Sequence, residues 1–354
     1  PCDERLEWLT GFTGSAGQAI VTAERAVVFV DSRYTLQVRA QVADSDFEFA
    51  DLLNDKAADW LRGALAAKAT VAYDPWLHTS GEITKLEAAL GPDFHLSPTE
   101  NFLDGVWSDR PPMGAGQVFV HPIEFAGESH QDKRTRLGKS LAQEGLAASV
   151  LTLPESVCWL LNIRGEDIQN TPVVQCFAIL HADGRVHLAL HDPAQLSPEL
   201  REHLGQDVSL GRLSEFPDVL SQLSGRVTLD EASAPSAISR AMTKADIVAR
   251  RDPAGLPKAI KNAVELQGAR AAHLRDGAAM AEFLCWLDRE APAGNLTEID
   301  VAQHLESCRR STNALKDISF ETIRGPGPHG AIVHYRVNTD TNLRVEPGNL
   351  LLVD

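Results

Sequence analysis

Hydrophobic and polar positions in the first third of the chain alternate between short apolar runs and amphipathic segments. The run at 26–30 (AVVFV) is β-branched and aromatic, and it is followed by the good N-cap residues Asp31 and Ser32. This pattern predicts a strand that leads into a helix. Similar signals predict helices at 33–42, 56–66 and 82–90, and a strand at 70–73. We therefore predict an α/β domain over residues 1–108.

The next segment follows a linker rich in proline and glycine at 109–116. A polar helix is predicted at 130–144 and a strand at 148–153. Two further strands, at 173–180 and 186–190, flank an Asp183-Gly184 turn and predict a hairpin. These elements predict a second α/β domain over 117–251.

Two heptapeptides resemble each other across these segments. Residues 8–14 (WLTGFTG) and 159–165 (WLLNIRG) both begin with Trp-Leu and end with Gly, and apolar strands and a helix follow each. Two related α/β domains would produce such an echo.

A second boundary, at 252–257, ends in Pro257, which suits the first residue of a helix. Two apolar stripes then predict core-facing helical surface: Ile260, Val264, Ala271 and Leu274, followed by Met280, Phe283, Leu284 and Leu287. Thr297 and Asp300 have capping-box spacing for a helix that carries Val301, Leu305 and Cys308. Strands are predicted at 320–324, 331–335 and 350–353, so residues 252–354 are predicted to open an α+β domain.

The apolar run at 350–353 predicts a strand buried on both faces, and Asp354 is the last residue. The first residue, Pro1, is not a methionine. We therefore expect a fragment whose final strand opens a larger domain.

Charge and cysteine usage narrow the function classes. The 354 residues include 49 acidic and 33 basic side chains, for a net charge of −16, which disfavours partners such as nucleic acid and anionic membrane. No run approaches the roughly 18 apolar residues of a membrane span. Five scattered cysteines without Cys-x-x-Cys spacing favour reduced thiols in the cytoplasm.

The segment 325–330 (GPGPHG) satisfies the G-x-G-x-x-G pattern of dinucleotide sites. Pro326 and Pro328 remove two backbone donors, and a strand rather than a helix is predicted to follow. We therefore favour a rigid turn, and a dinucleotide-dependent oxidoreductase is the disfavoured alternative.

Three side chains remain as candidate functional residues. On the predicted strand His334 shares a face with Ile332 and Arg336, which suits either an anion or carbonyl ligand or a half-buried histidine with one backbone partner. Arg33 lies in a predicted first helical turn, where its charge opposes the helix dipole, so it is either used in function or simply solvated. Asp354 closes an apolar strand, as a metal ligand or a turn cap would.

Collinear motifs across the whole chain resemble the three-domain Xaa-Pro aminopeptidases (aminopeptidase P) of the creatinase-type metallopeptidases. Motifs similar to the family's first two domains lie at 1–5, 8–17, 30–34, 159–165 and 170–174. Motifs similar to its catalytic domain lie at 258–262, 275–278, 297–299, 319–323 and 330–335.

The resemblance implies two creatinase-N-like α/β domains and the start of a "pita-bread" α+β catalytic domain. It implies a cytoplasmic enzyme, dimeric when complete, that removes the N-terminal residue from peptides with proline second. Two divalent metals, usually Mn²⁺ with Zn²⁺ or Co²⁺ as alternatives, are held in that family by two Asp, one His and two Glu. Asp354 matches the first Asp, His334 a substrate-contacting catalytic histidine, and Arg33 a substrate-binding arginine.

Two departures from the family pattern matter. His329 stands where the family usually has Asn or another small polar residue. The second Asp, the metal His and both Glu have no match in the chain, so we expect this chain alone to be inactive. The alternative is a non-catalytic binding protein of the same fold with a vestigial metal site.

Overall fold

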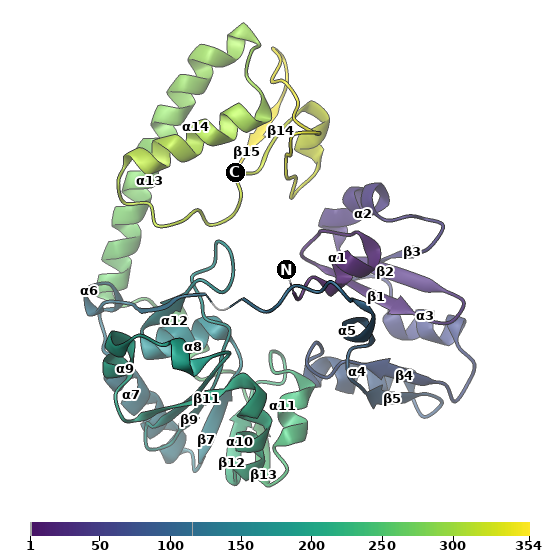
Figure 1. Cartoon of the computed structure of the whole chain (residues 1–354), viewed down its shortest axis with the longest axis vertical. Coiled ribbons are helices and arrows are strands. Elements are labelled where there is room, and N and C mark those ends of the chain that lie inside the picture. The colour runs from purple at the N-terminus through teal and green to yellow at the C-terminus, as the bar shows by residue number, and fades with distance from the viewer. Residues whose placement is uncertain (1, 115) are drawn as a thin grey trace. The chain divides into compact units, whose positions relative to one another are not determined.

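The computed structural model describes residues 2–114 and 116–354 (Figure 1). The chain divides into two compact units. One unit contains the chain up to Ala66 together with Leu103–Pro111 and Ala269–Asp354. The other contains Ala67–Phe102 and Pro112–Gly268.

The N-terminal part of the first unit is a small sheet with helices. β1 (Gly17–Val21) pairs antiparallel with β2 (Ala26–Val30), and β2 pairs parallel with β3 (Glu48–Asp51). The accompanying helices are α1 (Arg5–Thr10), the 3-10 turn η1 (Ser32–Tyr34), α2 (Thr35–Gln41), α3 (Ala57–Ala64) and α5 (Phe102–Val106). Asp31 accepts from the backbone N–H of Arg33 as the N-cap of η1, which confirms the predicted strand-to-helix transition. The core of this part is formed by Phe12, Val28, Val30, Tyr34, Val38 and Val42.

The C-terminal part of the same unit is built on two helices, of which α13 (Ala263–Glu290) enters it at Ala269. They are followed by a short β-ladder. The further elements are η4 (Ala291–Ala293), α14 (Glu298–Ser311), β14 (Arg324–Pro326), η5 (Gly327–Ala331) and β15 (Leu351–Val353). Thr297 and Asp300 form the predicted capping box. The core of this part contains Phe283, Val301, Leu305 and Cys308, as the helical pattern predicts.

Several predictions for this part are wrong. Residues 331–335 are not a strand: η5 and a turn occupy them, and β14 begins at Arg324 and not at Phe320. β14 takes β15 as its partner, so the apolar run after Gly330 has no neighbouring strand to pair with among the described residues. β15 itself is only half-buried: Leu352 is 36% exposed and Leu350, just before it, 87%.

The first apolar stripe on the helices is also exposed, contrary to prediction. Ile260, Val264 and Leu274 are 67%, 37% and 79% exposed. Phe283 is fully buried, with Met280 and Leu287 against it, whereas Leu284 is 50% exposed. Pro257 is the third residue of α12 (Gly255–Ala259), not the first.

The second unit is organised around a mixed six-stranded sheet. The strand order is β11 (Val208–Arg212), β10 (Val186–Leu190), β9 (Phe177–His181), β7 (Ala148–Leu151), β12 (Gly225–Leu229) and β13 (Ala245–Ala249). β9 and β10 form the predicted antiparallel hairpin, which begins at Phe177. β7, β12 and β13 are mutually parallel.

Helices bury both sides of this sheet. One apolar cluster includes Leu137 of α7 (His130–Gln143) and Leu160 of α8 (Pro154–Leu161); the other includes Phe216 of α10 (Phe216–Gln222) and Ile238 of α11 (Ser236–Ala241). The remaining elements are β4 (Thr70–Tyr73), α4 (Ser80–Leu90), β5 (His95–Pro98), β6 (Val118–Val120), α6 (Ile123–Ala126), β8 (Ile163–Gly165), η2 (Pro193–Gln195), α9 (Pro198–Leu204) and η3 (Leu213–Glu215). Among the described residues, no helix is long and apolar enough to cross a membrane.

The two echoing heptapeptides occupy equivalent places. Trp8 lies in the last turn of α1, which ends at Gly11 in the left-handed region (φ 77°). Trp159 lies in the last turn of α8, which ends at Asn162, also left-handed (φ 50°). Gly and Asn are the residues that adopt this helix-ending conformation most readily. The echo therefore marks the same helix stop in two domains.

Candidate functional site

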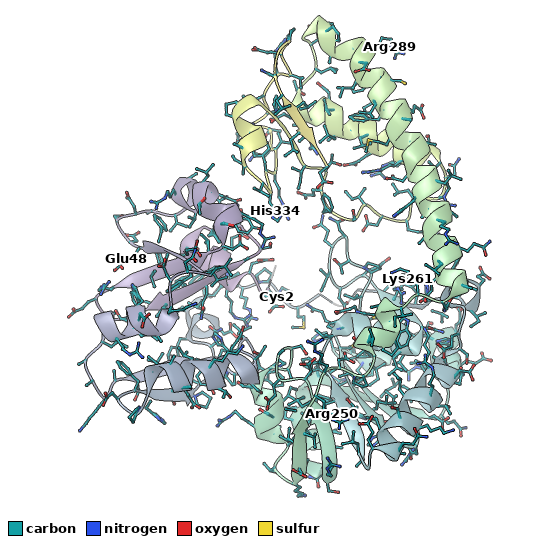
Figure 2. All side chains as sticks on the ribbon, turned by 180° about the vertical axis from the view of Figure 1, so that it is seen from behind. Cys2, Glu48, Arg250, Lys261, Arg289 and His334 are labelled. Atoms are coloured by element: carbon teal, nitrogen blue, oxygen red, sulfur yellow. The ribbon has the colours of Figure 1, made fainter. Side chains whose placement is uncertain are left out.

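His334, labelled in Figure 2, lies on the turn that follows η5. A tyrosine from the N-terminal part of the same unit contacts it. Tyr34 Oη is 2.7 Å from His334 Nδ1. The two rings meet edge-on, with centroids 5.5 Å apart at an interplanar angle of 70°. The structure therefore places His334 against the 31–34 turn, in a loop and not on the predicted strand.

Tyr34 is itself rigidly placed. It is only 1% exposed and belongs to the core of the N-terminal part, where Phe12 packs edge-on against its ring. Its hydroxyl also lies 2.7 Å from Ser15 Oγ. Ser15, Tyr34 and His334 thus form one continuous hydrogen-bonded chain.

Arg33 lies beside this chain. Its guanidinium forms a bidentate pair with the Asp31 carboxylate, with Nε 3.0 and 3.1 Å from the two oxygens, and it lies 5.3 Å from the centre of the Tyr34 ring. The hydrogen bond from Arg33 lowers the pKa of Asp31. The same pairing raises the pKa of Arg33. Two of the three predicted site residues, Arg33 and His334, therefore come together around Tyr34.

Asp354 ends β15, as predicted, and extends its ladder through backbone hydrogen bonds with Ile323 of 2.9 and 3.0 Å. Its side chain is exposed, contrary to the expectation that the strand delivers a carboxylate into an interior. Among residues 2–114 and 116–354, no group of three His, Cys, Asp or Glu side chains is placed to hold a metal ion. The described residues alone therefore do not form the implied two-metal site.

Sequence reasoning missed Glu298, the first residue of α14. Its side chain has no exposed surface, and its Oε1 lies 2.8 Å from His329 Nδ1. Oε2 accepts from the backbone N–H of Leu343 at 2.9 Å and lies 3.4 Å from Tyr335 Oη. The available signal was an acidic residue directly after the N-cap Thr297, which is common at helix starts and so was not distinctive.

The glycine motif at 325–330 is not the predicted turn between two strands: Gly325 and Pro326 end β14, and the 3-10 helix η5 begins at Gly327. A Cβ on Gly325 would lie 2.5 Å from the His329 carbonyl carbon, so only glycine fits there. Gly327 is left-handed (φ 54°) and opens η5. These glycines serve close backbone packing, and no α-helix opens at the third one.

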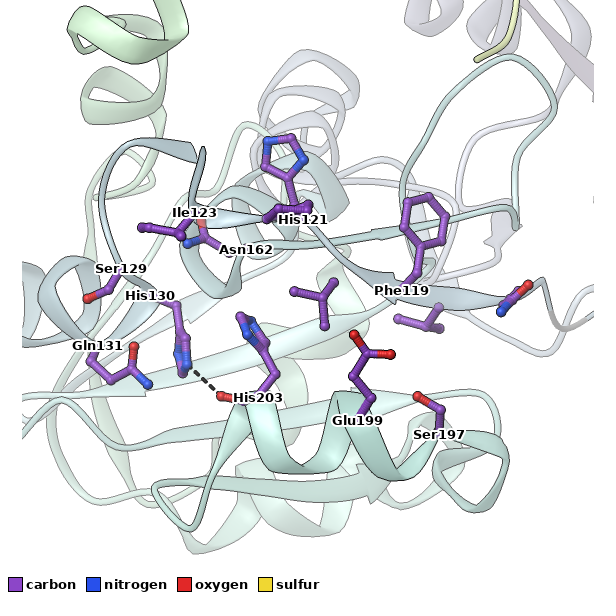
Figure 3. A pocket seen from close by; sticks show the side chains of 14 residues that line it. Phe119, His121, Ile123, Ser129, His130, Gln131, Asn162, Ser197, Glu199 and His203 are labelled. Carbon is purple, nitrogen blue, oxygen red and sulfur yellow. Dashed lines mark hydrogen bonds between the residues drawn. The ribbon is translucent and has the colours of Figure 1, made fainter. Parts of the chain in front are cut away.

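The second unit contains a cavity of about 610 Å³ near α9 and β6 (Figure 3). Its lining includes His121, His130 and His203. His130 Nε2 lies 2.7 Å from the carbonyl of His203, and His130 Nδ1 accepts from Arg134 Nε at 3.3 Å. Burial lowers the pKa of His121 and of His130 to about 4. His130 is thus a neutral, structurally engaged imidazole.

Comparisons with known proteins cover the whole chain. Sequence models described as the creatinase/prolidase N-terminal domain match residues 2–106 and again 109–265, and the model of metallopeptidase family M24 matches 267–354. The repeated N-terminal match agrees with the echo around Trp8 and Trp159. It also confirms the predicted fold class of two related domains followed by a metallopeptidase domain.

Named relatives point in the same direction. Aminopeptidase P1 of Lotus japonicus is 30% identical over 99% of this chain and 64% of its own length. The probable Xaa-Pro aminopeptidase P of Coccidioides posadasii (strain C735) is 34% identical over all of this chain and 57% of its own.

A solved structure also matches over the full chain. It is an X-prolyl aminopeptidase from Caenorhabditis elegans, described as a cytosolic enzyme with a di-nuclear active site, with 28% identity, a TM-score of 0.90, and coverage of 100% of this chain and 60% of that one. The chain thus spans about 60% of the length of these relatives.

Proposed function

Because residues 267–354 match the model of metallopeptidase family M24, and residues 2–106 and 109–265 match models of the creatinase/prolidase N-terminal domain, we propose that the chain is part of an Xaa-Pro aminopeptidase, which releases the N-terminal residue from peptides with proline second. The observation that carries this proposal is the convergence of Arg33 and His334 around Tyr34, within a chain that matches an X-prolyl aminopeptidase at a TM-score of 0.90. The proposed domain bounds are 1–108, 117–251 and 252–354.

The chemistry of the substrate suits these side chains. A peptide bond before proline has no N–H, so the enzyme can recognise this bond only through its carbonyl oxygen and its shape. His334 supplies a donor to that oxygen and to the oxyanion that develops from it. Arg33 supplies a fixed positive charge at the edge of the same turn, where it binds a carbonyl or carboxylate of the peptide.

The proposed metal centre contains two divalent ions, of which Mn²⁺ is the preferred identity, with Zn²⁺ and Co²⁺ as alternatives. Asp354 is its one proposed ligand in this chain. Since the described residues provide no ligand group of three, the site is incomplete within them, and we propose that the 354 residues alone are inactive. The active protein is proposed to be cytoplasmic and homodimeric, with proline-containing peptides as its substrates.

The test uses two proteins. One is the 354-residue chain, and the other is a longer protein that contains this chain and is as long as its relatives. With Mn²⁺, the longer protein is expected to cleave Arg-Pro-Pro after the arginine, and the shorter one is not. Asp354→Ala in the longer protein is expected to abolish high-affinity Mn²⁺ binding in calorimetry, while Asp340→Ala, at another exposed aspartate, leaves it intact.

Two results would overturn the proposal. Cleavage by the 354-residue chain would contradict the proposal that the metal site is incomplete within these residues. A longer protein that binds no Mn²⁺ and cleaves no Xaa-Pro peptide would favour the alternative, a non-catalytic binding protein of the same fold.

A further inference from the structure

The hydrogen-bonded chain of Ser15, Tyr34 and His334 has a direction that its chemistry decides. Tyr34 Oη has one proton to donate and lies 2.7 Å from both Ser15 Oγ and His334 Nδ1. Neutral imidazole carries its single proton on one of its two nitrogens, and the hydrogen bond at one nitrogen decides which. The partner of Nδ1 therefore decides what Nε2 can do.

A phenol is much more acidic than the N–H of a neutral imidazole, and a ring nitrogen is a better acceptor than a phenol oxygen. The favoured arrangement has Ser15 donating to Tyr34 Oη and Tyr34 donating to His334 Nδ1. Nδ1 is then the acceptor, and the imidazole proton resides on Nε2.

We propose that Tyr34 is a positioning residue that holds His334 as the Nε2–H tautomer, with its donor available to the carbonyl oxygen of the scissile bond. This inference rests on the proposed function for its substrate, but the tautomer itself does not depend on that function. Tyr34 is not a catalytic residue, because it acts through His334.

The position of His334 in the fold explains why such a partner is needed. His334 lies on a turn after η5, where no strand ladder fixes the backbone and with it the direction of the side chain. Tyr34, by contrast, is 1% exposed and is fixed by the core around Phe12. A ring held by the N-terminal core therefore gives the His334 imidazole a fixed partner.

The first test observes the tautomer in the 354-residue chain. Histidine labelled with ¹⁵N reports which ring nitrogen carries the proton through long-range ¹H–¹⁵N correlations, and His334→Gln assigns the His334 signals. We expect the Nε2–H pattern in the wild type and a mixture of the two tautomers in Tyr34→Phe, which keeps the packed ring and loses only the hydroxyl. Tyr73→Phe, in the other unit, is the matched control and is expected to leave the pattern unchanged.

Ser15→Ala provides an independent variant that leaves Tyr34 in place. It removes the donor to Tyr34 Oη but not the donor to Nδ1, so the Nε2–H pattern is expected to persist. A wild-type signal of the Nδ1–H form, or an unchanged His334 pattern in Tyr34→Phe, would overturn the proposal.

The second test uses the full-length protein. Tyr34→Phe is expected to lower kcat about tenfold with little change in KM, because the donor is misoriented in the transition state and not lost from the ground-state complex. A rise in KM at constant kcat would contradict a positioning role. If the wild type itself cleaves no Xaa-Pro peptide, the proposed function fails. The tautomer proposal is then still decided by the ¹⁵N measurement alone.

Discussion

His329 Nδ1 lies 2.8 Å from Glu298 Oε1, and this carboxylate has no exposed surface. A buried carboxylate is costly unless donors surround it. Glu298 has three donor groups nearby, all from the segment that contains His334: His329, Tyr335 and the backbone N–H of Leu343. One side chain at the start of α14 therefore organises the loop that carries the proposed catalytic histidine.

Glu298→Gln is expected to lower the free energy of unfolding of the C-terminal part of its unit by about 2 kcal/mol. The amide places an NH₂ group opposite one of the donors and leaves that donor buried without an acceptor. Urea unfolding of the 354-residue chain measures the change. Glu306→Gln on the same helix is the control and is expected to stay within about 0.5 kcal/mol, because Arg310, its ion-pair partner, is 68% exposed. Equal losses in the two variants would contradict the organising role of Glu298.

Arg33→Lys in the full-length protein is expected to raise KM for an Xaa-Pro peptide about tenfold and to leave stability nearly unchanged. Lysine keeps the charge but loses the bidentate fork that Asp31 orients. Steady-state kinetics and thermal unfolding check both parts. Arg25→Lys is the control, because Arg25 makes a similar exposed bidentate pair, with Glu48, and has no proposed substrate role. A similar change in KM for both variants would remove Arg33 from the substrate site.

Local patterns predict a helix or strand well where the residues that stabilise it lie close together in the sequence. The 26–30 strand with its Asp31 cap, the Asp183-Gly184 hairpin and the Thr297 capping box are each encoded within a few residues, and the structure confirms them. The strand predicted after Gly330 does not form. A strand needs a partner strand, and β14, which precedes this run, pairs with β15 instead. Periodicity also cannot tell whether any segment covers a helix face, as the exposed Leu274 shows.

The candidate site could be predicted in its members but not in its arrangement. The local pattern makes Arg33 and His334 candidates, and the resemblance assigns them substrate roles. The hydrogen bond of Tyr34 with His334 joins positions far apart in the chain, which no local pattern reports. Glu298 was hidden for another reason: an acidic residue at a helix start is usually solvated, and its burial depends on how the 327–343 segment folds over it.

Thiol reactivity is expected to single out one cysteine. Cys285 is exposed, while Cys2, Cys158, Cys176 and Cys308 are buried free thiols. Burial raises the pKa of Cys308, and the hydrogen bond with Cys158 together with burial raises that of Cys176, so the thiolates of these two residues are scarce at neutral pH. The same hydrogen bond lowers the pKa of Cys158, but this thiol is only 2% exposed and so is closed to a reagent. A disulfide reagent is expected to modify one thiol per chain rapidly, and Cys285→Ser to abolish this fast phase. A second fast thiol in the folded protein would contradict the burial pattern.

Lys133→Met is expected to destabilise the second unit by about 2 kcal/mol. Lys133 is 1% exposed, and its ammonium donates to the carbonyl of Trp159 at 3.0 Å and to Asn162 Oδ1 at 2.8 Å, at the end of α8. A cation at this position complements the helix C-terminus, and its loss leaves two buried acceptors unpaired. Urea unfolding measures the effect. The exposed Lys139→Met on the same helix is the control, and a loss as large as that of Lys133→Met would contradict the assignment.

Acidification is expected to weaken the second unit through His130. Burial lowers the pKa of His130 to about 4, against about 6.5 in an unfolded chain, so between these values the unfolded state binds more protons than the folded state. Stability therefore falls as the pH falls from about 6.5 to 4. The full shift would correspond to about 3 kcal/mol, and solvent screening reduces the expected contribution to about 1–2 kcal/mol.

Unfolding free energies at pH 7 and pH 4.5 check this sign and size. His130→Gln removes one of two histidines in this unit whose pKa burial lowers to about 4, so it is expected to reduce the slope of the pH dependence, while His121 still contributes to it. The variant loses stability at pH 7 because the bonds to Arg134 and the His203 carbonyl are impaired. His191→Gln, at an exposed histidine, is the control and is expected to keep the wild-type slope. The attribution to His130 fails if the slope of His130→Gln equals that of the wild type, because another group would then bind the proton that accompanies unfolding.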